Sequence, residues 1–170
     1  MGTMEQNINI RIWNESDFPI VRKILLDTWL DTYSSFIPVE DISSYLESTY
    51  NVEKLKLILE NPDSISFIIE SGIKSLGYMR ISISKTENRF YISSLYILPE
   101  YQGLGLGKSL LSKAKEEAAA RGYTSIYLGV MKQNVKSLRW YENHGFIFKE
   151  ELPFQMGKTT VSHLIGQMKI

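Results

Sequence analysis

Three glycines in alternate positions, Gly103, Gly105 and Gly107, stand between an apolar run and a helix-forming segment. Glycine has no side chain, so consecutive backbone N–H groups can approach a ligand oxygen closely, in conformations that other residues avoid. The Leu-, Ala-, Lys- and Glu-rich segment 108–121 predicts a helix, whose first turn adds unpaired N–H groups and the positive end of its dipole. The spacing therefore predicts an anion site, with phosphate as the natural ligand.

Two familiar phosphate-binding loops do not fit this segment. A nucleotide-hydrolysing loop needs a glycine five residues before Gly107, where Gln102 stands. A dinucleotide-binding loop that starts at Gly103 needs a third glycine where Lys108 stands, and no acidic residue marks the end of a following strand. Nucleoside triphosphate hydrolysis and a nicotinamide or flavin fold are therefore both disfavoured.

A second block lies further along the chain, with Asn134, Ser137, an aromatic pair at Trp140 and Tyr141, and then Gly145-Phe146. The first block reads Gln102-Gly103-Leu104-Gly105-Leu106-Gly107. The two blocks together resemble the GNAT superfamily of N-acetyltransferases. Its acetyl-coenzyme A motif is Gln or Arg, two residues, Gly, any residue, then Gly or Ala.

The resemblance implies an α/β (α+β) fold with a mixed, mostly antiparallel central sheet of about seven strands, flanked by helices, whose central strands splay apart. It implies acetyl-coenzyme A as co-substrate, with pantetheine on the exposed backbone of one splayed strand and the pyrophosphate on the N–H groups of the glycine loop. The residues expected to bind the cofactor are Leu95, Tyr96, Ile97, Gln102, Gly103, Leu104, Gly105, Leu106, Gly107, Lys108 and Asn134.

Tyr141 is the catalytic residue that the resemblance implies. When an amine attacks a thioester, the departing thiolate must be protonated, and a phenol held near the sulfur can supply that proton. A thiol has a pKa of roughly 8.5 and a phenol one of roughly 10, so the transfer is modestly uphill. Two alternatives stay open, that Tyr141 only hydrogen-bonds to the developing charge, or that Trp140 and Tyr141 are both core aromatics.

The sequence names no general base. Some relatives carry Glu in the splayed strand where this chain has Gly129, and others carry it on the strand before the glycine loop, where Tyr91, Ser93 and Ser94 stand. An amine with a pKa near 10 is protonated at about pH 7, so some path for its proton is needed. The groups left open for a water-mediated path are Glu70, Glu87 and the carboxylates of the helical segment.

The acceptor is interpreted as a primary amine. The segment 128–130, followed by Asn134, resembles bacterial polyamine N-acetyltransferases, so spermidine or spermine is the first candidate. Such a substrate needs an acidic lining. The carboxylates available in the helices expected over the acceptor are Asp27, Asp31, Glu40, Asp41 and Glu47. Protein N-termini, lysine side chains and aminoglycosides remain open as acceptors, and so does a non-catalytic acyl-coenzyme A sensor.

The composition of the chain excludes several further classes of function. The 170 residues, expected to form a single domain over 1–170, include 19 basic and 19 acidic residues, so no overall field attracts nucleic acid. The chain has no cysteine, which excludes disulfides and thiolate metal sites, and no metal is expected. No apolar run approaches the roughly 20 residues of a membrane span. A cytoplasmic protein without a membrane partner is expected.

Hydrophobic periodicity and turn residues predict the elements that position these groups. Strands are expected at 8–12, 64–70, 74–84, 89–98, 125–130, 146–152 and 161–170. Helices are expected at 15–33, with Asn14 as its cap and Pro19 in its first turn, and at 39–49, 52–59, 108–121 and 135–143. The strands between 64 and 98 read as an antiparallel meander, and the last two as a closing hairpin. That hairpin leaves an apolar strand able to extend a neighbour's sheet, so a homodimer stays open.

Overall fold

The computed structural model describes residues 7–170, which contain one sheet of seven strands in the order β1-β2-β3-β4-β5-β7-β6. All neighbouring strands are antiparallel except β4 and β5, which are parallel. The strands are β1 (Ile8–Ile12), β2 (Ser64–Ser71), β3 (Lys74–Ser84), β4 (Arg89–Ile97), β5 (Ser125–Met131), β6 (Ile147–Met156) and β7 (Thr159–Lys169). This arrangement confirms the expected mixed, mostly antiparallel sheet.

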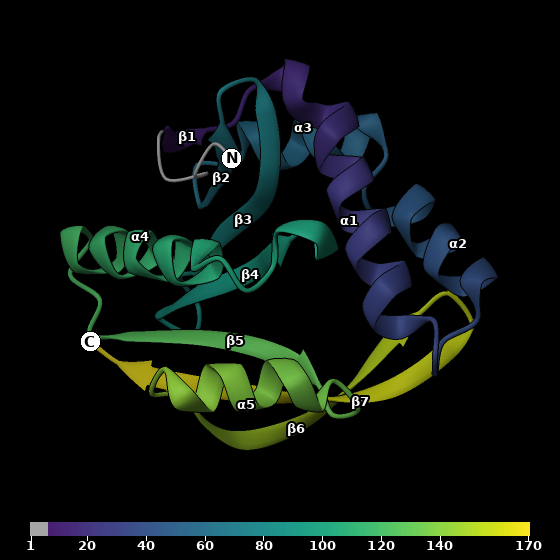
Figure 1. Ribbon diagram of the computed structural model, residues 1–170. Coiled ribbons are helices and arrows are strands. Elements are labelled where there is room, and N and C mark those ends of the chain that lie inside the picture. Colours follow the sequence, from purple (N-terminus) through teal and green to yellow (C-terminus); the bar gives the residue numbers. More distant parts are fainter. Residues whose placement is uncertain (1–6) are drawn as a thin grey trace.

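Helices cover both faces of the sheet (Figure 1). On one side lie α1 (Phe18–Tyr33), α2 (Val39–Thr49) and α3 (Val52–Glu60), and on the other lie α4 (Leu106–Ala120) and α5 (Val135–Asn143). Within the described part of the chain, none of these helices is both long and apolar enough to cross a bilayer.

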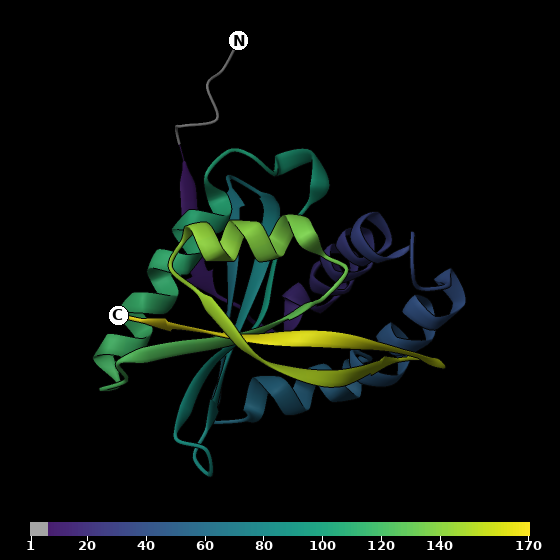
Figure 2. The same ribbon diagram turned by 90° about the horizontal axis from the view of Figure 1, so that it is seen from below.

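Two apolar cores, one on each face, hold the layers together. In the first core, Phe67 and Phe90 of the sheet pack with Leu110 of α4, and Tyr141 of α5 also belongs to it. The second core lies under α1, α2 and α3 and is rich in aromatic residues. The β6–β7 hairpin reaches this second core and comes up against α2, as Figures 1 and 2 both show.

The sheet splits in its middle. Only Tyr91 of β4 and Tyr127 of β5 form a registered pair, and beyond it the two strands diverge (Figure 1). In the ladder between β3 and β4, Arg80 lies opposite Ser94 and Ile81 lies opposite Ile92, so Ser93 is an extra residue in β4. A bulge of this kind bends a strand and re-aims its side chains. The expected splaying of the central strands is therefore confirmed.

Three predicted boundaries are corrected. The helix after the glycine loop begins at Leu106 rather than at 108, because Gly105, with φ of +82°, takes the N-cap position. Asn14 caps a short 3-10 helix (Glu15–Asp17), and α1 begins after it, with Pro19 in its first turn. The closing hairpin is tighter than predicted, because β6 extends to Met156 and β7 already starts at Thr159.

Candidate functional site

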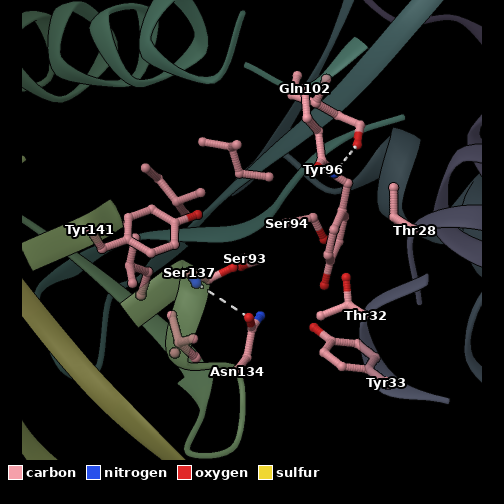
Figure 3. A pocket seen from close by; sticks show the side chains of 16 residues that line it. Thr28, Thr32, Tyr33, Ser93, Ser94, Tyr96, Gln102, Asn134, Ser137 and Tyr141 are labelled. Atoms are coloured by element: carbon pink, nitrogen blue, oxygen red, sulfur yellow. Dashed lines mark hydrogen bonds between the residues drawn. The ribbon is translucent and has the colours of Figure 1, made fainter. Parts of the chain in front are cut away.

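A cavity of about 120 Å³ lies where β4 and β5 diverge (Figure 3). Residues of α1 form one wall, and Asn134, Ser137 and Tyr141, in and just before α5, form the wall opposite. Part of the predicted set lines this cavity, namely Leu95, Tyr96, Ile97, Gln102, Asn134 and Tyr141. The fold therefore brings together residues from both sequence blocks.

The inner edge of β4 supplies backbone groups to this cavity. Because only Tyr91 is paired with β5, the segment 92–97 has no ladder partner on that side. Backbone N–H and C=O groups are strong hydrogen-bonding groups that need partners from elsewhere. The carbonyl of Ile97 accepts one bond, from Nε2 of Gln102 at 2.9 Å, and Oε1 of Gln102 accepts one from Lys136 at 3.4 Å. Gln102 thus links the end of β4 to α5.

The glycine loop leads from Gln102 to α4. Gly103 and Gly105 have φ of +79° and +82°, in the left-handed region that glycine adopts without strain, and nothing lies within 4 Å of a Cβ built on either. The N-cap of α4 makes no side-chain hydrogen bond, and the first helical bond runs from Ser109 N–H to Gly105 at 3.1 Å. The segment 103–108 is largely exposed, lies outside the cavity lining, and has helix N–H groups free for an anion.

Gly107 is needed for packing rather than for its φ. A Cβ at this position would lie 3.3 Å from the ring of Trp140, which is tighter than an ordinary contact. The start of α4 therefore lies directly against α5, which carries Trp140 and Tyr141. This contact fixes the position of the glycine loop relative to the wall of the cavity.

Tyr141 points its hydroxyl group into the cavity (Figure 3). Its ring packs in the first core, edge-on to Trp140 at 5.0 Å and to Phe146 at 5.5 Å. Burial raises the pKa of Tyr141 above its ordinary value of about 10, so the phenol is protonated at neutral pH. The ring is thus a core aromatic, as one interpretation held, while its O–H group remains available as a donor.

Asn134 has the capping role expected from the sequence. Its side-chain oxygen accepts a hydrogen bond from Ser137 N–H at 3.3 Å, at the start of α5 (Figure 3). The same side chain lines the cavity. Capping fixes the first turn of the helix that carries Tyr141.

A second cavity of about 280 Å³ adjoins the first. Tyr33, Ile92, Ser93, Tyr96 and Gly129 line both cavities. The other walls of the second cavity are mainly aromatic and contain two basic side chains. These further residues include Trp29, Tyr45, Tyr50, Phe154, Arg80 and His163. A molecule in the second cavity would therefore meet a molecule in the first near Tyr96 and Gly129.

The expected acidic lining is wrong, since no Asp or Glu among residues 7–170 lines either cavity. In α1, Thr28 and Thr32 face the first cavity. Asp27 and Asp31 are the residues directly before them, and successive residues of a helix point about 100° apart. The two carboxylates therefore lie on a different face of α1. Asp27 pairs with Lys23, and Asp31 is exposed.

The acidic residues of α2 are also engaged elsewhere or exposed. Asp41 accepts hydrogen bonds from Lys158 N–H at 2.9 Å and from the Thr159 hydroxyl at 2.6 Å. It therefore fastens the β6–β7 hairpin to α2. Glu47 pairs with Arg22, and Glu40 is exposed.

The two carboxylates named for a proton path lie outside both cavities. Glu70 accepts hydrogen bonds from Arg11 at 3.1 Å. Glu87 accepts a hydrogen bond from the hydroxyl of Tyr91, a residue that lines the second cavity. Glu87 thus contacts a lining residue but does not itself line that cavity.

His163 is a residue that the sequence analysis missed. A Cβ at Gly129 would lie 3.0 Å from its Nδ1, so the imidazole occupies the space beside the glycine. Phe154 packs beside the imidazole with ring centroids 5.4 Å apart, and burial lowers the pKa of His163 below its ordinary value of about 6.5. The only sequence signal was its place in an apolar strand, and its closeness to Gly129 depends on the register of β5 and β7.

The sequence model of the acetyltransferase (GNAT) family matches residues 22–146. A probable spermine N(1)-acetyltransferase of Bacillus subtilis subsp. natto is 37% identical over 133 residues, covering 71% of this chain and 83% of that protein. A spermidine N(1)-acetyltransferase of Thermoplasma acidophilum is 25% identical over 144 residues, covering 82% and 88%.

A similar fold is found in the crystal structure of PaiA N-acetyltransferase from Thermoplasma acidophilum in complex with coenzyme A. Its TM-score is 0.83 at 23% identity, and the alignment covers 97% of this chain and all of that chain. Because the family match spans most of the sequence, the chain belongs to the acetyltransferase (GNAT) family of N-acetyltransferases.

Proposed function

We propose that this protein transfers an acetyl group from acetyl-coenzyme A to a primary amine while both substrates are bound. The observation that carries this proposal is the buried, protonated phenol of Tyr141, whose hydroxyl points into the cavity between β4 and β5. The PaiA structure, which contains coenzyme A, supports the donor, and family membership supports the reaction.

In this proposal the cofactor follows the split in the sheet. The pantetheine arm lies along Leu95, Tyr96 and Ile97, where its amides replace the missing ladder partners of β4. The pyrophosphate lies on the N–H groups of 103–108, at the start of α4. Gln102 holds the end of β4 in place, and Asn134 contacts the cofactor from the opposite wall.

Catalysis proceeds by direct attack of the amine on the thioester carbonyl. A C–N bond forms, the C–S bond breaks, and Tyr141 protonates the leaving thiolate or hydrogen-bonds to it. The ordinary pKa values of thiol and phenol differ by roughly 1.5 units, or about 2 kcal/mol. Burial raises the pKa of Tyr141 further, which favours a hydrogen bond to the developing thiolate over complete proton transfer.

His163 is the proposed acceptor of the amine proton. The other titratable or charged groups lining the second cavity are Arg80 of β3, Tyr91 and Tyr96 of β4, Tyr33 of α1, and Tyr45 and Tyr50 at α2. Arg80 is a permanent cation, and burial raises the pKa of Tyr33 to about 12. His163 is neutral above its lowered pKa and has a nitrogen lone pair to accept a proton.

Two relatives support a polyamine acceptor, because they are called spermidine N(1)-acetyltransferase and probable spermine N(1)-acetyltransferase. The lining of the second cavity does not support it, because no carboxylate of the described residues is there to bind further ammonium groups. The acceptor is therefore proposed only as a primary amine.

Tyr141→Phe tests the proposal. The variant should lose about 100-fold or more in kcat, because it removes the proton donor, while its Kd for acetyl-coenzyme A should stay close to that of the wild type. The measurement is coenzyme A release in the presence of amines, combined with calorimetry. Tyr123→Phe, outside both cavities, is the matched control. An acyl-coenzyme A sensor would instead bind the cofactor tightly and release none with any amine.

A further inference from the structure

The second cavity contains a cation without an acidic partner. Arg80 forms no ion pair with any carboxylate among residues 7–170, and its buried Nε has no hydrogen-bond partner in that part of the chain. Among residues 7–170, the side chain of Arg80 donates one long hydrogen bond, from Nη2 to the hydroxyl of Tyr50 at 3.4 Å. A guanidinium presents five donors, and a buried donor without a partner is costly. Arg80 therefore has donors left for an anion that enters the cavity.

The surroundings of Arg80 fix its position. It lies on β3 opposite Ser94, next to the bulge at Ser93, and on the face of the sheet that carries the second core. Its guanidinium carbon lies 5.9 Å from the centre of the Tyr50 ring. Trp29 packs edge-on to Tyr50 at 5.6 Å, so the aromatic wall beside the cation is itself packed. The aromatic side of the cavity beside the cation is therefore held in place before a ligand binds.

We infer that the acceptor carries an anionic group, a carboxylate or a phosphate, which Arg80 binds while the amine lies near Gly129 and His163. This inference rests on the proposed function, since it names the substrate class of the same site. Planar guanidinium groups bind both oxyanions through paired hydrogen bonds. A polyamine would instead bring a second positive charge toward Arg80 with no carboxylate to offset it.

The size of the cavity fits a small acceptor. Its volume of about 280 Å³ lies just below the roughly 300 to 1,000 Å³ typical of small-molecule sites. Apart from Arg80 and His163, the lining of the cavity is mainly aromatic and apolar, which suits a short apolar spacer between amine and anion. The inferred class is therefore a short amino acid or amino phosphate with its amine at one end.

Matched pairs of acceptors test this inference. We would measure kcat/KM, per unprotonated amine, for 4-aminobutyrate against 4-aminobutanamide and for 3-aminopropyl phosphate against 3-aminopropanol, with spermidine alongside. The wild type should prefer at least one anionic member by about tenfold or more, as expected for a charge-assisted bidentate contact. The two pairs distinguish a carboxylate from a phosphate.

Substitution of Arg80 should remove that preference. In Arg80→Gln the ratio of anionic to neutral acceptor should fall close to one, and in Arg80→Lys, which keeps the charge but not the planar fork, it should be intermediate. Arg22→Gln is the matched control, because Arg22 pairs with Glu47 and lines neither cavity. Its ratio should equal that of the wild type.

Several outcomes would overturn the inference. They are a wild-type ratio near one in both pairs, a preference for spermidine, or a ratio that persists in Arg80→Gln. A ratio near one with a shifted pH profile would mean that Arg80 only lowers the pKa of the incoming amine. If no amine is acetylated, the proposed function fails first. Calorimetry would then measure the affinity of the coenzyme A-bound protein for the anionic and the neutral amine of each pair. Equal affinities within both pairs would overturn the inference.

Discussion

Replacing His163 by glutamine should remove the proton acceptor of the second cavity while leaving a side chain of similar length in its place. The imidazole lies beside Gly129, with Nδ1 3.0 Å from the position of a Cβ there, and packs beside Phe154. Glutamine retains hydrogen-bonding groups but has no basic nitrogen. The change therefore tests proton transfer separately from packing.

The expected loss follows from the ionisation of the imidazole. Burial lowers the pKa of His163 below about 6.5, so more than about 90% of the protein has a neutral imidazole at about pH 7.5. General bases contribute typically 10²- to 10⁴-fold, and an imidazole less basic than the amine should act at the lower end. We expect kcat/KM to fall about 100-fold in His163→Gln at this pH.

The pH profile gives the sharper result. Below its pKa the imidazole is protonated and cannot accept a proton, so activity is lost as pH falls through that value. In the wild type, the slope of log kcat/KM against pH should therefore be one unit steeper below the pKa of His163 than above it. The break should lie below about pH 6.5, since the pKa is lowered. His163→Gln should show no such break.

The assay is the initial rate of coenzyme A release from about pH 5 to pH 8.5 at a fixed, low amine concentration. The control is His144→Gln, because His144 bonds through Nδ1 to the carbonyl of Trp140 at 2.7 Å and lines neither cavity. This control should keep the break. A break that survives in His163→Gln, or a loss of less than about threefold, would refute the role given to His163.

Two further predictions concern stability. Gly157 and Gly72 have φ of +60° and +59°, but a Cβ at Gly157 would lie 2.6 Å from Asp41 Oδ1, whereas Gly72 faces open space. Gly157→Ala should therefore cost about 1 to 3 kcal/mol more than Gly72→Ala in urea unfolding, and equal midpoints would contradict this. Arg11 donates hydrogen bonds to the buried Asp17 and lowers its pKa, so this carboxylate stabilises the fold above about pH 4 and loses its contribution as pH falls through the lowered value. Asp17→Asn should cost about 1.5 to 3 kcal/mol at about pH 6, and this cost should shrink progressively as pH falls below about 4. A cost independent of pH would contradict the ionic contact.

The elements of the fold were largely predictable because local signals agree with tertiary structure. Alternating apolar residues and turn residues between 64 and 98 predicted β2, β3 and β4, which pair as a meander. The boundary at Leu106 could not be predicted, because it depends on the backbone conformation of Gly105. The periodicity of a helix predicts which of its residues share a face, but it does not predict which part of the molecule that face contacts.

The candidate site was predictable only where its residues lie in a local motif. Asn134 caps the short helix that carries Tyr141, and the two share a sequence motif, so both were predicted, and both line the first cavity. His163 is close to Gly129 only through the register of β5 and β7. Arg80 enters the second cavity beside the bulge in β4, which no local pattern indicates. The acidic lining was wrong because the carboxylates of α1 lie one residue away from the face that meets the cavity.

The parting of β4 and β5 gives this sheet four edges instead of two. Besides β1 and β6 at the outside, the sheet has two inward edges that follow the pair Tyr91 and Tyr127. The unpaired N–H and C=O groups of a strand edge can hydrogen-bond to any molecule whose amides have the spacing of a strand. These bonds do not depend on the side chains of the edge strand. The side chains of Leu95 and Ile97 can therefore vary with the packing they serve, while the inward edge keeps the same donors and acceptors. The proposed pantetheine site is thus specified largely by topology, and many side-chain substitutions along it should leave binding unchanged.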